Sequence, residues 1–387
     1  MNLKTALPHT QVTDRWRLIL PDNRAIASKM DISSVLLLGT ENAVALPVVR
    51  SLGSLMPDLR IHALSRDDGH YQIARYSKYV HSHQFIRSDT EEELLKELKD
   101  KVKETHATIL LPVDEYFVRV LSSIKDELGK AVCLPPLPGP DLFDSLVYKN
   151  RLSEVLVQSG LPSAVTYPLH QVDPSQTSNE FFPCLLKPVF GASGREIVKI
   201  TDRDMLRRYM KRLDTEKFII QEYIPGMDIG CSMLAVNGEI KALTTQKSLA
   251  KKGFSFSTAI RFKYYPEVAD LVRQLIRHTG YSGLADLDFR LDERDGQPKL
   301  TDFNARFWRS LLGSKAAGID FTLLNCFAAM GIPFDMPEFT ESTYLMGKST
   351  IAHYQSKFNF SSGSAIPVTT DLWSRITDPF PEIIRFL

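Results

Sequence analysis

The sequence predicts two kinds of structure in one chain, an open parallel α/β domain followed by a larger α+β region. Three observations carry this prediction. Short apolar segments alternate with helical patterns up to residue 112, a proline-rich link occupies residues 134–140, and two hairpin signals, Asn237-Gly238 and Asp295-Gly296, come later. At 387 residues the chain is also too long for one compact core, so we expect two or three packed subdomains.

The first region reads as a parallel sheet with covering helices. Residues 1–32 show no clear period and are expected to form an extension or an early strand-like arm. Strands are then predicted at residues 35–39, 60–64 and 108–112, short extended pieces at 79–80 and 84–86, and helices at 43–52, ending near Gly53, and at 91–103. Because strands and helices alternate, the sheet is expected to be parallel.

The region after the proline-rich link has a different pattern of predicted strands and helices. A helix is predicted at residues 144–159, stopped by Gly160 and Pro162, and is followed by strands at 181–187, 196–200 and 218–224. The two hairpins pair 231–236 with 239–245 and 284–291 with 299–303. Between them, residues 266–279 carry apolar side chains at helical spacing. This pattern predicts an antiparallel sheet with covering helices.

Composition excludes several classes of protein. The 47 basic and 46 acidic residues leave a net charge of +1, which gives no long-range field for nucleic acid or a membrane surface. The four cysteines are scattered with no CxxC pair, so we expect buried reduced thiols rather than a zinc knuckle or a disulfide framework. The sequence shows neither an apolar leader pattern nor a spanning segment of about 20 residues. The expectation is a cytoplasmic protein.

Acidic and amide side chains gather at the second hairpin. Asp286 and Asp288 are two apart on one strand, and Asp302 and Asn304 are two apart on its partner, so each pair shares a face. Folding about Asp295-Gly296 brings Asp288 near Asp302 and Asn304. These oxygen ligands suit a magnesium ion that shares its coordination with nucleotide phosphates. The structural alternative is a solvated polar face of the hairpin.

Two further segments have nucleotide-binding character. Lys187 ends an apolar strand and leads into the small-residue loop Gly191-Ala192-Ser193-Gly194-Arg195, where backbone N–H groups could approach phosphate oxygens. The loop is neither a Walker loop nor a GxGxxG motif, and a plain glycine turn is the alternative. The segment 221–228 runs from a strand into Pro225-Gly226, whose exposed backbone could read an adenine edge. Alone it is only a strand-to-turn junction.

The order of these elements resembles the ATP-grasp family from about residue 35 to about residue 321. The resemblance rests on five loose motifs in sequence: Lys149, Lys187 with its loop, 221–228, Asp288, and Asp302-Phe303-Asn304-Ala305-Arg306. The stretch 302–318 is similar to the signature of carbamoyl-phosphate-synthase-like members. The resemblance implies a pre-ATP-grasp Rossmann-like domain at 33–140, a small ATP-grasp subdomain at 141–225, a large subdomain with the metal site at 226–332, and an extension at 333–387.

The resemblance also implies a role for each site residue. Lys149 and Lys187 would contact the phosphates of ATP, and Ser193 and Gly194 would lie in a flexible loop that closes over them. Asp288, Asp302 and Asn304 would hold magnesium, with manganese as the alternative. Arg306 and Lys247 would meet the transferring phosphoryl group. The adenine and ribose would be held by Gln221, Glu222, Ile224 and Asp228. Aspartate at 302 and 228 is one methylene shorter than the family's usual glutamate.

The activity implied by the resemblance is ADP-forming ligation. A small carboxylate is activated as an acyl phosphate and then attacked by an amine or a thiol. Phosphorylation of a carboxylate or carbonate without ligation, and a catalytically silent nucleotide-binding regulator, remain alternatives. The expected partners are small-molecule substrates, and the sequence does not decide between a monomer and a homo-oligomer.

A few further residues are candidates for the site, and most of them have a structural interpretation as well as a functional one. Trp308 and Arg309 could wall the acceptor pocket, with packing as the alternative for Trp308. Asp114 and Glu115 follow a parallel strand, where open α/β sheets bind ligands, but acids at a helix N-terminus are the simpler account. Lys251 and Lys252 are expected to face solvent.

Overall fold

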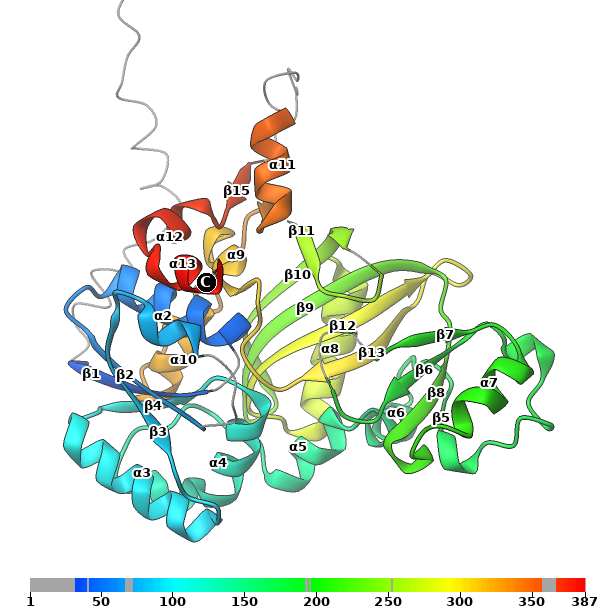
Figure 1. The fold of residues 1–387 in the computed structure, drawn as a ribbon, viewed down its shortest axis with the longest axis horizontal. Helices are drawn as coiled ribbons and strands as arrows, with labels where there is room; N and C mark the ends of the chain where they lie inside the picture. Colours follow the sequence, from blue (N-terminus) through cyan, green and yellow to red (C-terminus); the bar gives the residue numbers. More distant parts are fainter. Residues whose placement is uncertain are drawn as a thin grey trace, which may run out of the picture.

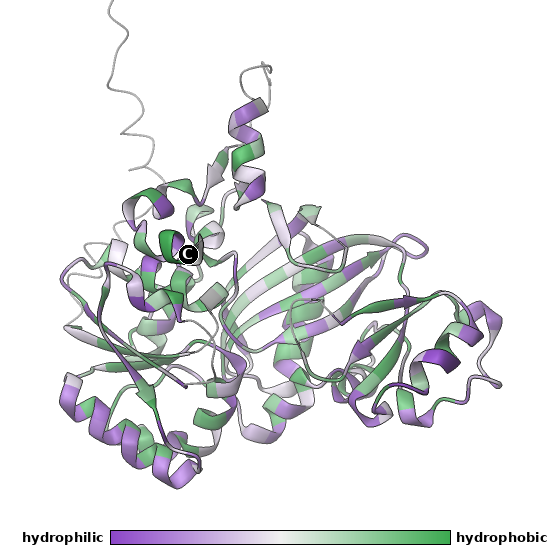
Figure 2. Cartoon of the chain, in the orientation of Figure 1, coloured by the Kyte–Doolittle hydropathy of each residue, from purple (hydrophilic) through white to green (hydrophobic). Residues whose placement is uncertain are grey.

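The computed structural model describes residues 32–39, 42–66, 72–191, 194, 196–251, 253–356 and 367–386. Three sheets follow one another across the molecule, a parallel one, a large and mainly antiparallel one, and a small antiparallel one (Figure 1). The predicted mixed α/β fold, with a parallel sheet first and antiparallel sheets after it, is confirmed. The inner strands consist largely of hydrophobic residues, whereas outer helices such as α3 (Glu91–Thr105) alternate hydrophilic and hydrophobic residues (Figure 2).

The first sheet is fully parallel, with strand order β3-β2-β1-β4. Every residue of its central strand is at most 3% exposed, because helices cover both faces, which explains the continuous apolar run in the sequence. The two short extended pieces that the sequence suggested form one strand, β3. The strands are β1 (Ser34–Leu38), β2 (Arg60–Arg66), β3 (Val80–Ile86) and β4 (Ile109–Pro112).

The helices of this domain are α2 (Asn42–Leu55), α3 and α4 (Glu115–Leu128). Helix α2 does not end near Gly53, as the sequence predicted, but continues past it. A Cβ atom at position 53 would lie 2.2 Å from Cγ of Tyr79, so this glycine permits close packing rather than a helix stop. Thr90 and Asp114 cap α3 and α4 by accepting hydrogen bonds from Glu93 N–H and Phe117 N–H.

The single helix predicted at residues 144–159 is two helices, α5 (Pro140–Val147) and α6 (Lys149–Gln158). Tyr148 between them is extended, with φ −77° and ψ 117°. The reason lies far along the chain, because the N–H of Lys149 donates to the carbonyl of Val189 at 3.1 Å instead of to the preceding turn. The break places Lys149 at the first position of α6.

The small sheet has the order β5-β8-β6-β7 and its own apolar core. The predicted strand at 181–187 begins later, at Cys184, because residues 179–181 form a 3-10 turn. The elements are β5 (Thr166–Pro168), β6 (Cys184–Pro188), β7 (Val198–Ile200), α7 (Arg203–Met210) and β8 (Phe218–Glu222). Short 3-10 turns occur at Ile73–Tyr76, Leu169–Gln171, Asn179–Phe181 and Thr215–Lys217.

The large sheet contains both predicted hairpins. Asn237 and Gly238 have φ values of 49° and 77°, the left-handed pair that a type I′ turn requires. Helix α8 (Pro266–Thr279) has the predicted bounds and buries its apolar side against the sheet. The strand order is β13-β12-β9-β10-β11-β14-β15. These strands are β9 (Gly226–Val236), β10 (Glu239–Lys251), β11 (Ser257–Phe262), β12 (Gly283–Asp292), β13 (Pro298–Asn304), β14 (Ser342–Leu345) and β15 (Val368–Thr370).

The C-terminal residues complete the large sheet and return to the first domain. Strands β14 and β15 extend the sheet, and α13 packs beside residues 73–76 near α2 (Figure 1). The helices are α9 (Leu311–Ala316), α10 (Phe321–Ala329), α11 (Lys348–Ser356), α12 (Leu372–Thr377) and α13 (Phe380–Phe386). Residues 333–387 were expected to be a separate extension, and their described strands instead belong to the large sheet. The proposed domain boundaries otherwise remain a prediction.

Candidate active site

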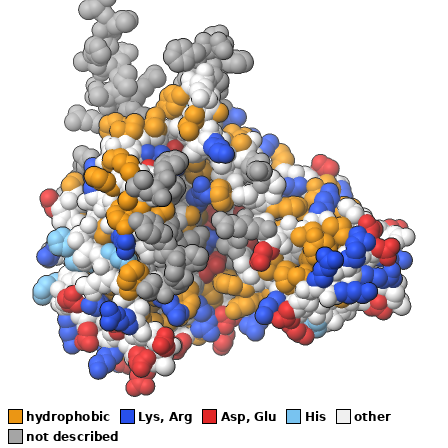
Figure 3. Space-filling model, viewed as in Figure 1, with side chains coloured by type: hydrophobic (Ala, Val, Ile, Leu, Met, Phe, Trp, Pro, Cys, Tyr) orange, Lys and Arg blue, Asp and Glu red, His pale blue; other side chains and the backbone are white. Residues whose placement is uncertain are grey.

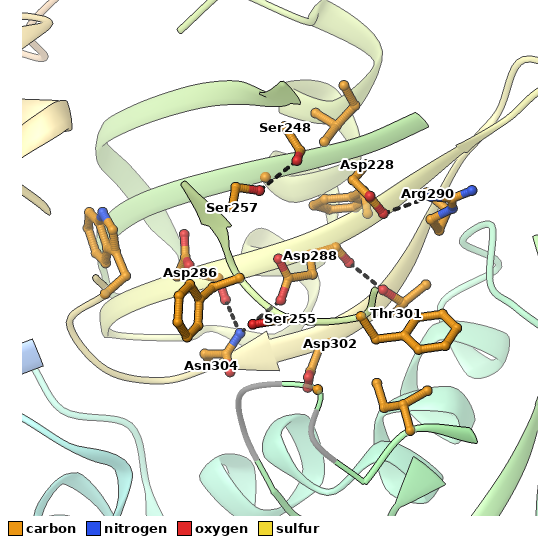
Figure 4. A pocket seen from close by; sticks show the side chains of 18 of the residues that line it. Asp228, Ser248, Ser255, Ser257, Asp286, Asp288, Arg290, Thr301, Asp302 and Asn304 are labelled. Atoms are coloured by element: carbon orange, nitrogen blue, oxygen red, sulfur yellow. Dashed lines mark hydrogen bonds and ion pairs between the residues drawn. The ribbon is translucent and has the colours of Figure 1, made fainter. Parts of the chain in front are cut away.

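A cavity of about 520 Å³ lies between the small and large sheets, within the usual size range of ligand sites. Acidic and basic side chains are visible in the recess at the centre of one face of the molecule (Figure 3). The small sheet contributes Lys187, Gln221 and Glu222, and the start of α2 contributes Ala43 and Val44. The second hairpin contributes Asp286, Asp288, Asp302 and Asn304 (Figure 4). Side chains from all three sheet regions therefore meet in one space.

Lys187 and Gln221 form the polar floor at the small sheet. They lie on the neighbouring strands β6 and β8, and Lys187 Nζ donates to Gln221 Oε1 at 2.7 Å. Gln221 Nε2 in turn donates to Thr166 Oγ1 at 3.0 Å, which fixes the amide. Both side chains are buried. Because an amide carries no charge, it orients the ammonium group without neutralising it, as a site for phosphate oxygens requires.

The segment predicted to read the adenine and ribose is held from behind by two arginines of β12 and its turn. Arg294 is ion-paired with the carboxylate of Glu222. Arg290 donates to the carbonyl of Ile224 at 3.1 Å and to Oδ1 of Asp228 at 2.8 Å. These side chains, apart from Arg294, line the cavity. Sequence reasoning missed both arginines, since nothing in their local pattern marks them.

Gly226 makes this bend possible. Its φ is +133°, and a Cβ atom there would lie 2.0 Å from the carbonyl oxygen of Leu291. The backbone of the 221–228 segment therefore passes directly against β12, and no side chain larger than glycine fits at this point.

The second hairpin brings its acids together as the sequence predicted. Asp286 is paired with Asn304 and Asp288 with Asp302 across the two strands. Asn304 Nδ2 donates to the Asp286 carbonyl at 2.9 Å and lies 3.4 Å from Asp288 Oδ2. Burial raises the pKa values of the Asp286 and Asp288 carboxyls, and the charge of Asp302 raises both further. The carboxylates of the cluster therefore repel one another in the absence of a bound cation.

A β-bulge aims these side chains. After the Asp288–Asp302 pair, the next pair is Phe289 with Leu300, so Thr301 is the extra residue. Thr301 Oγ1 donates to the Asp288 carbonyl at 3.0 Å and closes the bulge (Figure 4). Bulges beside active sites commonly redirect a side chain in this way.

The donors fit a magnesium ion that arrives with a nucleotide, rather than one held by the protein alone. Within the described residues, no three acidic, histidine or cysteine side chains converge closely enough to hold an ion by themselves. Asp286 Oδ1 accepts from Ser232 Oγ at 2.6 Å, and Asp302 Oδ1 lies 3.2 Å from Lys149 Nζ. Magnesium typically takes one or two carboxylates and completes its shell with water and phosphate oxygens. Asp288, Asp302 and Asn304 suit that role.

Lys149 lies behind the acid cluster and is not among the residues that line the cavity. Its Nζ also donates to the carbonyl of Gly191 at 3.2 Å, so Lys149 links Asp302 of β13 to the start of the glycine loop. Within that loop, Ala192, Ser193 and Arg195 lie outside the described residues. Gly194 lines the cavity with φ +64°, and a Cβ atom there would be 2.0 Å from the carbonyl oxygen of Phe254. The glycine loop therefore approaches the β10–β11 loop directly.

The structure does not bring Lys247 into the cavity. Its neighbours Gln246 and Ser248 line the space, and alternate residues of a strand point to opposite faces. Lys247 is paired with the buried Ile229 and lies on the side of the sheet that faces α8. The prediction for Lys247 is therefore corrected. Of the other basic residues considered there, Lys252 lies outside the described residues.

The far end of the cavity is lined by Arg306, Trp308 and Arg309. Arg306 Nη1 donates to the Phe307 carbonyl at 2.8 Å. The guanidinium of Arg309 lies over the ring of Phe256 at 3.5 Å from its centroid, a cation–π contact. Trp308 was predicted either to wall a pocket or to pack in the core. It does both, since it lines the cavity and also packs edge-on against Phe321. Sequence reasoning missed Phe256.

Residues 150–310 match the family model described as an ATP-grasp domain. This range contains the hairpin, the glycine loop and the 221–228 segment. The chain contains an ATP-grasp domain. The match begins one residue after Lys149 and includes every other residue predicted for the site.

One curated relative and several solved structures are similar to this chain over most of its length. A D-aspartate ligase of Enterococcus faecium (strain Aus0004) is 22% identical, with 70% of each chain covered. The structure of N5-carboxyaminoimidazole synthetase from Staphylococcus aureus with ADP has a TM-score of 0.65 at 16% identity, covering 84% of this chain and 86% of that one. The L-amino acid ligase from Bacillus licheniformis has a TM-score of 0.60 at 17% identity, covering 78% and 75%. These structures share the fold.

The described residues include no helix long and apolar enough to cross a membrane. The described cysteines form no disulfide, and Cys184, Cys231 and Cys326 are buried. Burial raises their pKa values, which keeps these thiols protonated. Their burial agrees with a structural role.

Proposed function

We propose that this ATP-grasp protein is an ADP-forming ligase that activates a small carboxylate as an acyl phosphate for attack by an amine. One observation carries the proposal. The buried Lys187, a cluster of acids that is open to the cavity, and Arg306 converge on one cavity of nucleotide size between the small and large sheets. A site with cations at one end, acids in the middle and further cations beyond suits a triphosphate carried by a divalent cation.

Each group has a task in this reaction. Lys187 binds phosphate oxygens, while Glu222 and Ile224 offer backbone groups to the adenine. Asp288, Asp302 and Asn304 hold the magnesium, or alternatively manganese, that neutralises the phosphates when bound. Arg306 faces the transferring phosphoryl group and the acyl phosphate, where negative charge accumulates. Asp228 takes a ribose hydroxyl through an oxygen that its ion pair with Arg290 keeps in place.

The substrates are proposed from chemistry and from similarity. A carboxylate oxygen attacks the γ-phosphorus, ADP leaves, and the amine then displaces phosphate from the acyl carbon. The D-aspartate ligase and the L-amino acid ligase are both named for amino acids. We therefore expect an amino acid on at least one side of the bond. A homo-oligomer remains a prediction, and a related carboxylase domain is described as a dimer.

A substrate screen tests the proposal. Phosphate release from MgATP is measured with each L-amino acid, D-aspartate and bicarbonate, alone and in pairs with amino acids as amines. We expect ADP and phosphate in equal amounts with selected pairs, and a mass-spectrometric product equal to the two acids minus water. ATP consumption that needs no second substrate would instead favour simple phosphorylation. Binding of ATP without any turnover across the panel would support a regulatory protein and contradict the proposal.

A further inference from the structure

The start of α4 holds an acidic side chain that the proposed reaction does not yet use. Asp114 caps the helix, accepting from Phe117 N–H at 3.1 Å, so this acid has a structural role. Glu115, the next residue, points elsewhere. Its Oε1 lies 3.6 Å from Nε of Arg306, and the two side chains are only 12% and 11% exposed. An ion pair this sheltered is screened far less by solvent than a surface pair.

Arg306 is therefore placed between two negative regions. On one side is Glu115 of the parallel domain. On the other is the acid cluster, where the charge of Arg306 lowers the pKa of Asp286 against the stronger effect of burial. The Phe307 carbonyl accepts a third contact from Nη1. A long arginine side chain has many rotamers, so such contacts decide where its guanidinium points.

The topology explains why the parallel domain reaches this point. Strands β1 and β4 are neighbours, and the chain leaves their carboxyl ends through α2 and α4. The start of α2 lines the cavity at Ala43 and Val44, and the start of α4 presents Glu115. The edge where open α/β sheets place ligands thus faces the end of the cavity that holds Arg306.

We propose that Glu115 is a positioning residue that holds the Arg306 guanidinium in the orientation used at the transferring phosphoryl group. The parallel domain thereby takes part in turnover rather than serving only as a support. This inference rests on the proposed function, because it assumes that Arg306 acts on the reacting phosphoryl group. It assigns no contact between Glu115 and the substrate.

The test compares Glu115→Gln with Glu91→Gln in the full chain. Glu91 is a matched control, because it occupies the same first position of a helix in the same domain but is exposed. With MgATP and a mixture of the twenty standard amino acids plus D-aspartate, kcat of Glu115→Gln should fall about ten- to a hundredfold, as expected when a catalytic group is misplaced. The KM for ATP should stay within about twofold, because Lys187 and the adenine segment are untouched.

Two further variants separate positioning from folding. Glu115→Asp keeps the negative charge, so its kcat should be higher than that of Glu115→Gln. If Glu115 served only the fold, kcat would not depend on whether the replacement is charged. In an Arg306→Lys background, Glu115→Gln should cause little further loss, because the group it positions is gone. Equal kcat in Glu115→Gln and Glu91→Gln, with an active wild type, would overturn the inference alone. Absence of ATP turnover in the wild type would overturn the proposed function, and the inference with it.

Discussion

At the scale of single residues, the candidate site combines groups that the sequence marks with groups that it does not. Asp288, Asp302 and Asn304 could be predicted because residues two apart on a strand share a face and a local turn sets the pairing. Arg290 and Phe256 could not, because each acts through a partner distant in sequence. Lys247 was misplaced for a similar reason, since its face depends on how β10 pairs with its neighbours.

Lys187 is predicted to contribute directly to nucleotide affinity. Lys187→Ala should weaken ATP binding about ten- to a hundredfold, because a charge-assisted contact contributes about 1.5–3 kcal/mol. Isothermal titration with MgATP measures this. Lys241→Ala is the control, because Lys241 is a lysine of the large sheet that pairs with Glu239 outside the cavity. An unchanged affinity in a folded Lys187→Ala protein would remove Lys187 from the site.

The raised pKa of Asp288 predicts how stability depends on pH in the nucleotide-free protein. In the folded state desolvation by the surrounding protein and the neighbouring carboxylates favour the protonated carboxyl, whereas in the unfolded state it ionises near its ordinary value of 3.8. The unfolded state therefore binds fewer protons above about pH 4, and this group destabilises the fold increasingly as pH rises towards neutrality. The melting temperature of Asp288→Asn should therefore exceed that of the wild type, and this difference should grow as pH rises between pH 5 and pH 8. A constant difference across that range would show that the folded protein does not raise the pKa of Asp288.

At the scale of elements, those that are determined by neighbouring residues could be predicted from the sequence, whereas those that depend on distant partners could not. The Asn237-Gly238 turn and α8 were predictable because turn chemistry and helical spacing are local. The break between α5 and α6 was not, because a carbonyl of the small subdomain, that of Val189, takes the N–H of Lys149. Strands β14 and β15 were also missed, since only their pairing with β11 makes them part of a sheet.

The turn between β12 and β13 is predicted to depend on one buried acid. Asp292 is fully buried and accepts hydrogen bonds from Arg294 and from Lys299 Nζ, the latter at 2.7 Å. These partners, Arg294 foremost, hold the pKa of Asp292 far below its usual range. Its contribution to stability is therefore present at neutral pH and is lost only as pH falls below the ordinary value near 3.8.

Asp292→Asn should lower the free energy of unfolding by about 2–3 kcal/mol at pH 7, because two cations lose their buried partner. Urea denaturation measures the change. Asp295→Asn is the control, since Asp295 belongs to the same turn but is about half exposed, at 46% of its side chain. Equal effects of the two substitutions would mean that the buried pair does not stabilise the turn.

At the scale of the whole molecule, a buried ion pair joins the two ends of the described chain. Arg50 of α2 lies 3.0 Å from Asp378, and Asp378 also accepts from Ser77 Oγ at 2.8 Å and from Lys78 N–H at 2.9 Å. Asp378 is fully buried. These contacts hold α12 and α13 against the parallel domain, which in turn meets the cavity through α2.

Removing one partner should loosen this connection. Arg50→Gln is expected to destabilise the fold by about 3–5 kcal/mol, because it leaves the Asp378 carboxylate buried without its cation. Hydrogen exchange should rise in α12 and α13 before it rises in α8. Arg261→Gln, which removes a more exposed pair with Glu341, should do neither. Uniform exchange in Arg50→Gln would contradict a local connection.

We propose that the second hairpin is a metal and phosphate site for catalysis and not a structural feature. Asp302 is repelled by Asp288 and attracted by Lys149 at 3.2 Å, so replacing its charge removes opposing interactions. Asp302→Asn should therefore leave the melting temperature of the nucleotide-free protein nearly unchanged. MgATP turnover with the selected substrate pair should fall at least about a hundredfold in the same preparation, because electrostatic stabilisation of the transferring phosphoryl group is lost. Near-normal magnesium-dependent turnover in Asp302→Asn would contradict the account.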